Sequence, residues 1–424
     1  MRTSYAILLL AATVWGRHVN AQWTQVGSTA NNIIACMLPF ENKLYLGGNF
    51  TNINGSTSYF SATYNGSTFG NHTTLLAGIG FQAFAVHNGS LFGGGGLTQQ
   101  FGPIGVGVWN SGTWSGGYNI GNPVNVNALA SFNGNLIVGG SFLDPALRVA
   151  QHNGTSYAVM GGGFDGTVTD FAIYNNELYA CGYMENSGST PLGNIAKWTG
   201  TAWVNVGTGL NGSASDMEVY NGQLYVCGTF SSAGGVAAQK IARWNGSAWS
   251  AVGSGIASGT GVTVNCMLAT SAGLLVGGRF TNAGGVSTGN VALWNGTNWS
   301  AAGSFTDETS VSTMQSFNGY VYLSTYGIIN SVATARLYRN GAVGVEEQAF
   351  APDVTAFPNP CEDLLRLEGD LTMVKSMAVL DVMGRAVAVQ RAANSVDLSA
   401  LSPGLYHLVL MGDSGQRALQ VMRH

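Results

Sequence analysis

A seven-residue pattern, Leu-x-x-Gly-Gly-x-Phe, recurs along most of this 424-residue chain. Clear copies read LYLGGNF (44–50), LIVGGSF (136–142) and LLVGGRF (274–280), and degenerate copies begin at residues 91, 178, 224 and 321. Successive copies start 42 to 50 residues apart. Repeats of this length that contain several short strands each are typical of β-propellers, in which every repeat forms one blade.

The repeat that contains the fifth copy shows the four strands that we expect in each blade. SDMEVY (215–220) and QLYVCGTF (223–230) flank one Asn-Gly pair, and KIARW (240–244) and AWSAVG (248–253) flank another. Asn-Gly between alternating runs predicts a tight hairpin, because both turn residues must adopt positive φ. Strands one and two therefore form one hairpin and strands three and four a second. The two-to-three and four-to-one connections are the long loops.

The start of the chain supplies the strand that the last repeat lacks. Fourth strands open with an aromatic residue, and seven such residues can be counted: Trp23, Phe69, Trp114, Tyr157, Trp203, Trp249 and Trp299. The seventh repeat ends at RLYRNGAVG (336–344) without one. We therefore expect an all-β, seven-bladed β-propeller over 22–344 that is closed by its N-terminal strand, since closure pairs the exposed edges. The alternative is an open array with a frayed first strand.

The first 21 residues are typical of a secretory signal peptide, with Arg2 ahead of a short apolar run and small residues at the cleavage site. The alternative, a membrane anchor, needs a longer apolar run, and no other stretch is long and apolar enough to span a bilayer as a transmembrane segment. The net charge of −4 and the lack of a basic patch give no support to nucleic-acid binding. Five widely spaced cysteines predict neither a disulfide framework nor a zinc site.

A second domain follows the propeller. Charged residues are sparse before residue 345 and much denser after it, and the change coincides with Pro352. We expect a linker over 345–355 and a small C-terminal β-sandwich over 356–424, because apolar and polar residues alternate along several strand-like stretches of 356–424.

Three ordered motifs lie in that second domain: AFPNPCEDLLRLEG (356–369), VLDVMGRAV (379–387) and VDLSALSPGLYHLVL (396–410). Together they resemble the type A C-terminal sorting domain of the Bacteroidetes type IX (Por) secretion system. The residues that carry the resemblance are Pro358, Asn359, Pro360, Asp381, Gly384, Arg385, Gly404 and Tyr406. The resemblance implies passage through the periplasm, recognition by the type IX secretion machinery, and release or attachment at the outer-membrane surface. More loosely, the repeats resemble secreted propellers of the kelch and galactose-oxidase shape, which implies fold alone.

Two acidic residues occupy equivalent positions in neighbouring repeats. The position eight residues before each repeat start is expected to line the central channel, at the mouth where the long loops emerge: Cys36, Ala83, Ala128, Asp170, Asp216, Cys266 and Thr313. Asp170 and Asp216, with Glu218 nearby, form a candidate site for a cation such as calcium or for sugar hydroxyls. The alternative is that each carboxylate bonds local backbone amides. No cofactor is required.

The sequence favours binding over catalysis. The propeller has few acidic residues at equivalent positions and no nucleophile motif, whereas catalysis needs converging acids, bases or metal ligands. We therefore expect a non-enzymatic adhesion or binding protein for an extracellular glycan or surface protein, with the long-loop face as its binding surface. An extracellular polysaccharide hydrolase or lyase is the alternative, and a structural part of a larger surface assembly is a third. The paired tryptophans, such as Trp244 and Trp249, are expected to pack between blades rather than to stack on sugars.

Overall fold

A computed structural model of the chain describes residues 23–423 with gaps at 73–76, 100–101, 111, 121–124, 144–146, 258, 306–309, 330, 341–354, 358–360, 369–370, 372–373, 375, 382–385, 388, 393 and 413–414. The expected signal peptide and almost all of the expected linker lie outside the described residues, as do Pro358, Asn359, Pro360, Gly384 and Arg385. The chain forms two compact units, one built of the repeats and one mainly of the C-terminal residues.

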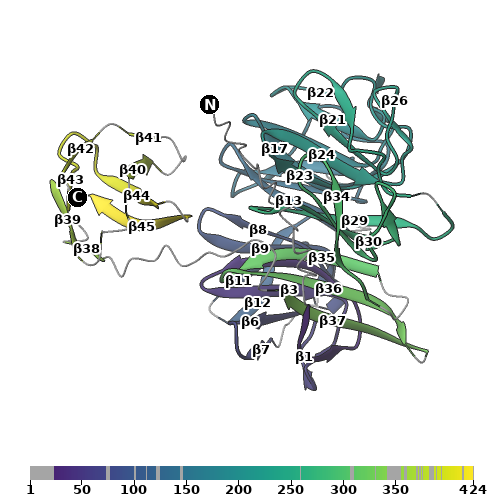
Figure 1. The fold of residues 1–424 in the computed structure, drawn as a ribbon, viewed down its shortest axis with the longest axis horizontal. Coiled ribbons are helices and arrows are strands. Elements are labelled where there is room, and N and C mark those ends of the chain that lie inside the picture. Colours follow the sequence, from purple (N-terminus) through teal and green to yellow (C-terminus); the bar gives the residue numbers. More distant parts are fainter. Residues whose placement is uncertain are drawn as a thin grey trace, which may run out of the picture. The chain divides into compact units, whose positions relative to one another are not determined.

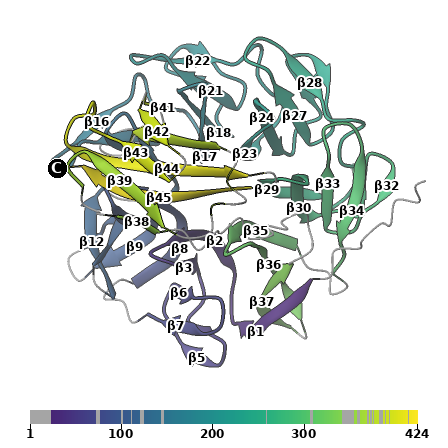
Figure 2. The ribbon, with the colours of Figure 1, turned by 60° about the vertical axis from the view of Figure 1, so that its left-hand side comes forward.

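The repeat unit is a seven-bladed β-propeller, as expected, and its sheets follow one another around a ring (Figures 1 and 2). Blade one comprises β2 (Ile34–Phe40), β3 (Lys43–Gly48), β6 (Ser61–Tyr64) and β7 (Phe69–Asn71). Blade two comprises β8 (Ala77–His87), β9 (Ser90–Gln99), β11 (Gly105–Asn110) and β12 (Thr113–Asn119), with β10 (Gly102–Pro103) paired with β9. Blade three comprises β13 (Val126–Phe132), β14 (Asn135–Gly140), β15 (Val149–His152) and β16 (Tyr157–Val159).

Blades four to six repeat the same antiparallel order. Blade four comprises β17 (Thr167–Tyr174), β18 (Glu177–Tyr183), β21 (Ile195–Trp198) and β22 (Trp203–Asn205). Blade five comprises β23 (Ala214–Tyr220), β24 (Gln223–Gly228), β27 (Ile241–Trp244) and β28 (Trp249–Ala251). Blade six comprises β29 (Thr263–Thr270), β30 (Gly273–Arg279), β33 (Val291–Trp294) and β34 (Trp299–Gly303). In four blades the two-to-three connection folds into a small hairpin: β4 (Asn52–Ile53) with β5 (Ser56–Thr57), β19 (Asn186–Ser187) with β20 (Thr190–Pro191), β25 (Ser232–Ala233) with β26 (Val236–Ala237), and β31 (Asn282–Ala283) with β32 (Val286–Ser287).

The N-terminal strand completes the seventh blade, which confirms the closed ring. This blade runs β35 (Ser310–Phe317), β36 (Tyr320–Ile329), β37 (Val332–Asn340) and then β1 (Thr24–Ala30). β1 pairs antiparallel with β37, with Gln25 opposite Tyr338. The Trp23 indole N–H donates to the carbonyl of Ala302 at 2.7 Å. Trp299 donates to the equivalent carbonyl one blade earlier at 3.1 Å, so Trp23 makes the bond of an ordinary fourth strand.

Blade seven also departs from the expected loop pattern. Long two-to-three connections are expected in every blade, yet β36 ends at Ile329 and β37 begins at Val332, so the expectation is wrong for this blade. It is also wrong for blade two, where β9 ends at Gln99 and its partner β10 begins at Gly102. In both blades the second strand extends outward and a short connection follows it.

The paired glycines of the repeat serve close packing at the ring. A Cβ on Gly139 would lie 2.6 Å from the Phe171 ring of the next blade, and one on Gly140 would lie 2.0 Å from the Asn125 carbonyl oxygen. Any side chain at these positions would push the inner strands apart. The Gly-Gly pair thus lets neighbouring blades approach closely around the channel.

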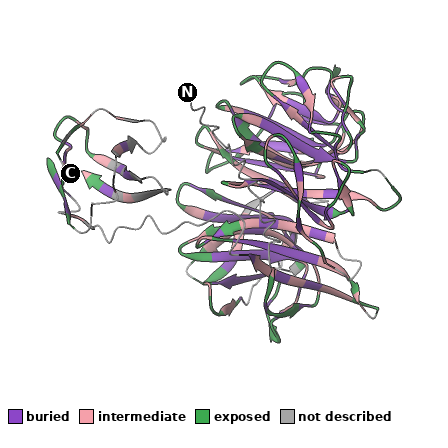
Figure 3. Ribbon diagram, in the orientation of Figure 1, coloured by how far each residue is buried: buried purple, intermediate pink, exposed green. Residues whose placement is uncertain are grey.

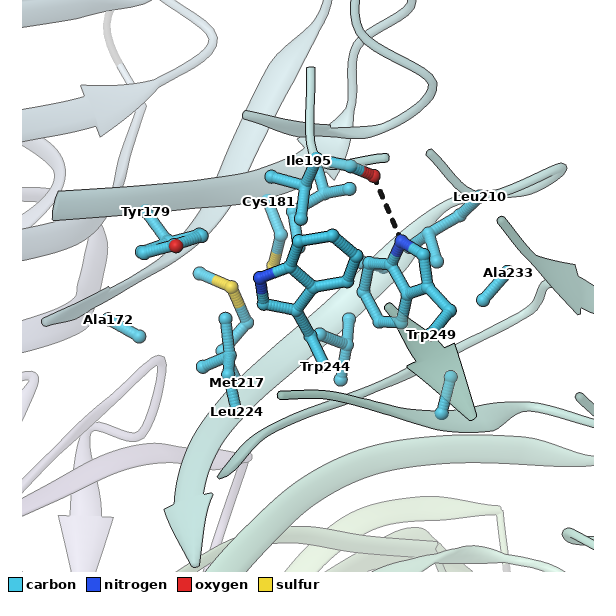
Figure 4. Packing of buried hydrophobic residues seen from close by; sticks show 14 of the residues in the cluster. Ala172, Tyr179, Cys181, Ile195, Leu210, Met217, Leu224, Ala233, Trp244 and Trp249 are labelled. Atoms are coloured by element: carbon cyan, nitrogen blue, oxygen red, sulfur yellow. Dashed lines mark hydrogen bonds between the residues drawn. The ribbon is translucent and has the colours of Figure 1, made fainter. Parts of the chain in front are cut away.

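The space between blades is filled by the repeated pattern of apolar residues, and most inner strand positions are buried (Figure 3). In blade five, the rings of Trp244 and Trp249 lie 5.3 Å apart between centroids and pack against Cys181 and Tyr179 of blade four (Figure 4). The Trp249 indole N–H donates to the carbonyl of Val206 at 2.9 Å. These paired rings are core, as expected from their repetition.

The C-terminal unit consists of two four-stranded antiparallel sheets. One sheet is ordered β38 (Thr355–Phe357), β39 (Leu364–Glu368), β43 (Ser395–Asp397) and β42 (Gln390–Ala392). The other is ordered β41 (Ala386–Val387), β40 (Ser376–Asp381), β44 (Gly404–Gly412) and β45 (Gly415–Arg423). Leu365 and Val396 of the first sheet share one buried cluster with Leu408, Leu410 and Val421 of the second. A common core between two sheets defines a small sandwich.

Candidate functional site

The central channel collects side chains from all seven blades. A cavity of about 240 Å³ is lined by every one of the seven equivalent positions counted from the sequence: Cys36, Ala83, Ala128, Asp170, Asp216, Cys266 and Thr313. The residue before each of these positions lines it as well: Ala35, Gln82, Asn127, Thr169, Ser215, Asn265 and Ser312. The structure therefore brings Asp170 and Asp216 together in one cavity.

A bulge in the innermost strand explains why two consecutive residues per blade face the channel. The pairing of β17 with β18 skips Thr169, and the pairing of β23 with β24 skips Ser215. A bulge places two residues of one strand opposite one of its partner and turns both toward the same side. The acidic position and the residue before it consequently point into the same cavity.

Each channel aspartate accepts a hydrogen bond from the next blade. Asp170 Oδ2 accepts the N–H of Met217 at 2.9 Å, and Asp216 Oδ2 accepts the N–H of Met267 at 2.5 Å. The alternative to a shared site is that each carboxylate bonds its own strand or turn. The bonds from Met217 and Met267 join blade four to five and blade five to six. Each aspartate also accepts the backbone N–H of the next residue in its own strand, Phe171 for Asp170 and Met217 for Asp216. The two carboxyl groups also share a hydrogen bond, which favours the charged form of Asp170.

The surroundings oppose ionisation of all three acids. Both aspartates keep part of their surface open to the channel, but protein atoms crowd them on every other side. Burial raises the pKa of Asp170 to about 7. Burial, followed by the negative charges of Asp170 and Glu218, raises the pKa of Asp216 well above its usual value. Burial and the charge of Asp170 raise the pKa of Glu218 to about 7. Removal of these carboxyls from water, together with the mutual repulsion of their negative charges, accounts for this pattern.

Glu218 stands apart from the two aspartates. It lies two residues further along β23 and is not among the residues that line the cavity. The backbone N–H of Ala269, in blade six, bonds its carboxyl group. Glu218 therefore also links two blades, and it influences the aspartates through its charge.

A second set of inter-blade bonds comes from the residue before each acidic position, which sequence reasoning missed. Thr169 Oγ1 donates to the carbonyl of Ala214 at 3.0 Å, and Asn265 Nδ2 donates to that of Val311 at 2.8 Å. Ser312 Oγ donates to the carbonyl of Ile34 at 2.8 Å and so joins blade seven to blade one. The signal in the sequence was the run of Asn, Thr and Ser at this position.

The channel acids thus serve as acceptors that hold blades together. Within the described part of the chain, no group of three or more His, Cys, Asp or Glu side chains could hold a metal ion. Calcium binding by Asp170 and Asp216 stays a prediction. Glycan binding by the same pair likewise stays a prediction.

The described sorting-motif residues lie in one part of the C-terminal sandwich. Tyr406 lies opposite Asp381 in the pairing of β44 with β40, and Gly404 begins β44. The Tyr406 hydroxyl donates to the carbonyl of Ser402 at 2.9 Å. The motif Leu-x-x-Gly-x-Tyr therefore fixes the turn that enters the central strand of this sheet.

Fold and channel together define a closed seven-bladed β-propeller whose polar channel residues join its blades, followed by a small β-sandwich. Residues 355–422 match the family model of the secretion system C-terminal sorting domain. This match confirms the resemblance to the type IX sorting domain, so the protein is an exported one that is secreted or attached to the cell surface. No curated protein matches the chain. Among the described residues, no helix has the length and apolarity needed to cross a bilayer.

Proposed function

We propose that this protein is a non-enzymatic binding protein that acts outside the cell, with a glycan or another surface protein as its ligand. The sorting domain accounts for its export, and the propeller is the part that remains to act at the destination. Propellers commonly bind ligands through loops or pockets held on a rigid ring.

The observation that carries this proposal is the use of the channel acids. Asp170 and Asp216 each accept a backbone N–H of the next blade, so these carboxyl groups are held by the scaffold. A catalytic acid or base must be free to exchange a proton with a substrate within hydrogen-bond reach. The cavity beside them, of about 240 Å³, is smaller than the ~300–1,000 Å³ usual for small-molecule sites.

The long-loop face remains our proposed surface for a macromolecular ligand. The loops there are fixed by repeated side-chain bonds: Asn211 Oδ1 accepts the N–H groups of Ser231 and Ser232 at 2.9 Å, and Asp165 Oδ1 accepts those of Glu185 and Asn186 at 2.9 Å. Loops that are ordered before binding lose less entropy when a ligand docks. This face is therefore suited to recognition.

The alternative function is that of an extracellular polysaccharide hydrolase or lyase. One observation favours it: a pair of carboxyl groups with raised pKa values is what acid–base chemistry near neutral pH requires. The mature protein, incubated with a glycan array and with a panel of bacterial and plant polysaccharides, distinguishes the two functions. Retention on glycans or on cell-surface protein without new reducing ends or unsaturated products supports binding. Sustained release of such products would establish the enzyme instead.

A further inference from the structure

A pocket of about 550 Å³ opens between blades one and two, away from the channel and at the end of the blades where the hairpin turns lie. Its walls include Phe40, Tyr45 and Trp109, and its rim includes Glu41, Lys43 and Asn110. This volume is within the ~300–1,000 Å³ range of small-ligand sites. The turns that carry the rim belong to the face opposite the long loops.

Comparison with blade four shows one difference at this pocket. In blade four, Tyr174 occupies the position of Phe40, and its hydroxyl donates to the carbonyl of Gly222 in the turn of blade five at 3.1 Å. The rings are placed alike in both blades, because Phe40 lies 5.8 Å from Tyr45 and Tyr174 lies 5.9 Å from Tyr179. Phe40 lacks the hydroxyl, as do Phe132 and Phe317 at the equivalent positions of blades three and seven. It cannot bridge to Gly89, the counterpart of Gly222, which lines the pocket.

The opening leaves an indole ring accessible. Trp244 lies beside the gap between blades four and five, which Tyr174 bridges. It is 7% exposed and packs with Tyr179 in one buried cluster (Figure 4). Its counterpart Trp109 is half-buried and forms part of the pocket wall. On its inner side, the centroid of the Trp109 ring lies 4.3 Å from that of His72 and 5.4 Å from that of Tyr45, edge to face with the Tyr45 ring. These contacts hold the ring in place before any ligand arrives.

The rim supplies both hydrogen-bond donors and acceptors, and it carries one acidic and one basic side chain. Glu41 and Asn42 adopt positive φ values of 47° and 56° in the tight turn, which places Glu41 and Lys43 close together on an exposed rim. Asn110 is exposed at the edge of the next blade. Because one acid and one base cancel, the rim does not select for a charged ligand. It offers acceptors, donors and an amide around an aromatic wall.

We propose that this pocket, formed by Phe40, Tyr45 and Trp109 with Glu41, Lys43 and Asn110 at its rim, binds a neutral saccharide. A pyranose ring has one apolar C–H face, which packs on an aromatic ring, and a circumference of hydroxyls that both donate and accept hydrogen bonds. The pocket matches both features. This inference rests on the proposed binding function and names its ligand class, at a site separate from the long-loop face.

The test uses the mature full-length protein and defined probes: the methyl glycosides of glucose, galactose, mannose and N-acetylglucosamine, with cellobiose and lactose. Saturation-transfer difference NMR detects binding, and tryptophan fluorescence titration measures affinity. Phe40→Tyr restores the hydroxyl that closes the equivalent gap in blade four. The matched control is Tyr174→Phe, the reverse exchange at the other site. Glu41→Ala with Lys43→Ala removes exposed rim groups without touching the core.

We expect the parent to bind at least one probe, Phe40→Tyr to weaken that binding by about tenfold or more, and the rim variant to weaken it as well. Tyr174→Phe leaves the Phe40 pocket intact and removes the bridge to Gly222, so it is expected to bind at least as strongly as the parent. Parent binding that persists unchanged in both Phe40→Tyr and the rim variant overturns the pocket assignment and leaves the proposed function standing. Failure of every probe to bind the parent also overturns it, and the proposed function is then decided by the glycan-array and surface-protein assays.

Discussion

The raised pKa values of the channel carboxyls predict how the stability of the folded protein changes with pH. The pKa of Asp170 is raised from 3.8 to about 7 in the folded protein, chiefly by burial. Between these two values the folded state holds a proton that the unfolded chain has lost. Stability attributable to this group is therefore present at low pH and is lost as pH rises toward 7. Asp216 and Glu218, whose pKa values are also raised, act in the same direction.

The size of the effect follows from the shift. At about 1.4 kcal/mol per pKa unit, a rise from 3.8 to about 7 corresponds to at most ~4 kcal/mol for Asp170. Solvent reaches the side chain through the channel, so screening reduces this figure, and we expect ~1–2 kcal/mol. Asp170→Asn keeps an oxygen that can accept the Met217 N–H but removes the titration. The stability of the variant relative to the parent should therefore increase as pH rises from 3.8 to about 7.

Urea unfolding at a series of pH values measures this difference directly. Asp165→Asn is the matched control: burial alone would raise the pKa of Asp165, but hydrogen bonds from Asn186 and Glu185 hold it below its usual value, outside the window. Its stability should run parallel to that of the parent above pH 3.8. A constant difference between Asp170→Asn and the parent from 3.8 to 7, or one that favours the parent more strongly as pH rises, would refute the argument.

Three further predictions concern closure, packing and export. Deleting residues 22–28 removes the half-buried Trp23, its bond to Ala302 and most of β1, so blade seven loses its paired outer strand and the melting temperature should fall sharply; an unchanged value would contradict closure by this strand. Gly140→Ala places a Cβ 2.0 Å from the Asn125 carbonyl oxygen and should destabilise the protein by about 2 kcal/mol or more in chemical unfolding, whereas Gly134→Ala, at an open turn, should cost less; equal costs would contradict the packing role. Removing residues 345–424 should leave a folded propeller in the periplasm of the native host, and normal surface display of this truncation, seen by fractionation, would contradict the sorting role.

The repeat spacing was sufficient to predict much of the fold, because propeller blades are local units with tight Asn-Gly turns. Closure was predictable because Trp23 stands where a fourth strand begins, and the structure gives it the same indole bond as Trp299. The channel position could be counted because it lies the same number of residues before the start of each repeat motif. The short connections in blades two and seven were missed, since the long-loop expectation was extended from repeats five and six to every blade.

The hydrogen-bond partners of the channel could not be predicted in the same way. That Asp170 bonds Met217 of the next blade depends on how adjacent strands are staggered, which the sequence of one repeat does not contain. The pocket between blades one and two lacks the bridging hydroxyl that Tyr174 supplies in blade four, and only the bond made by Tyr174 reveals what that hydroxyl does. Phe132 and Phe317 also lack it, so the residue type alone does not predict a pocket. Trp109 carries the same sequence signature as the buried Trp244, so pattern alone assigns both to the core.

The central claim is that this exported propeller binds its ligand on a rigid scaffold and that the channel acids hold the blades together. A crystal structure of the mature protein, soaked with the saccharide that gives the strongest saturation-transfer signal, tests it most directly. The account predicts ligand density against Trp109, with Glu41 or Lys43 in hydrogen-bond contact, and intact bonds from Met217 and Met267 to the channel aspartates. Ligand density in the channel beside Asp170 and Asp216, with either inter-blade bond broken to receive it, would contradict the account.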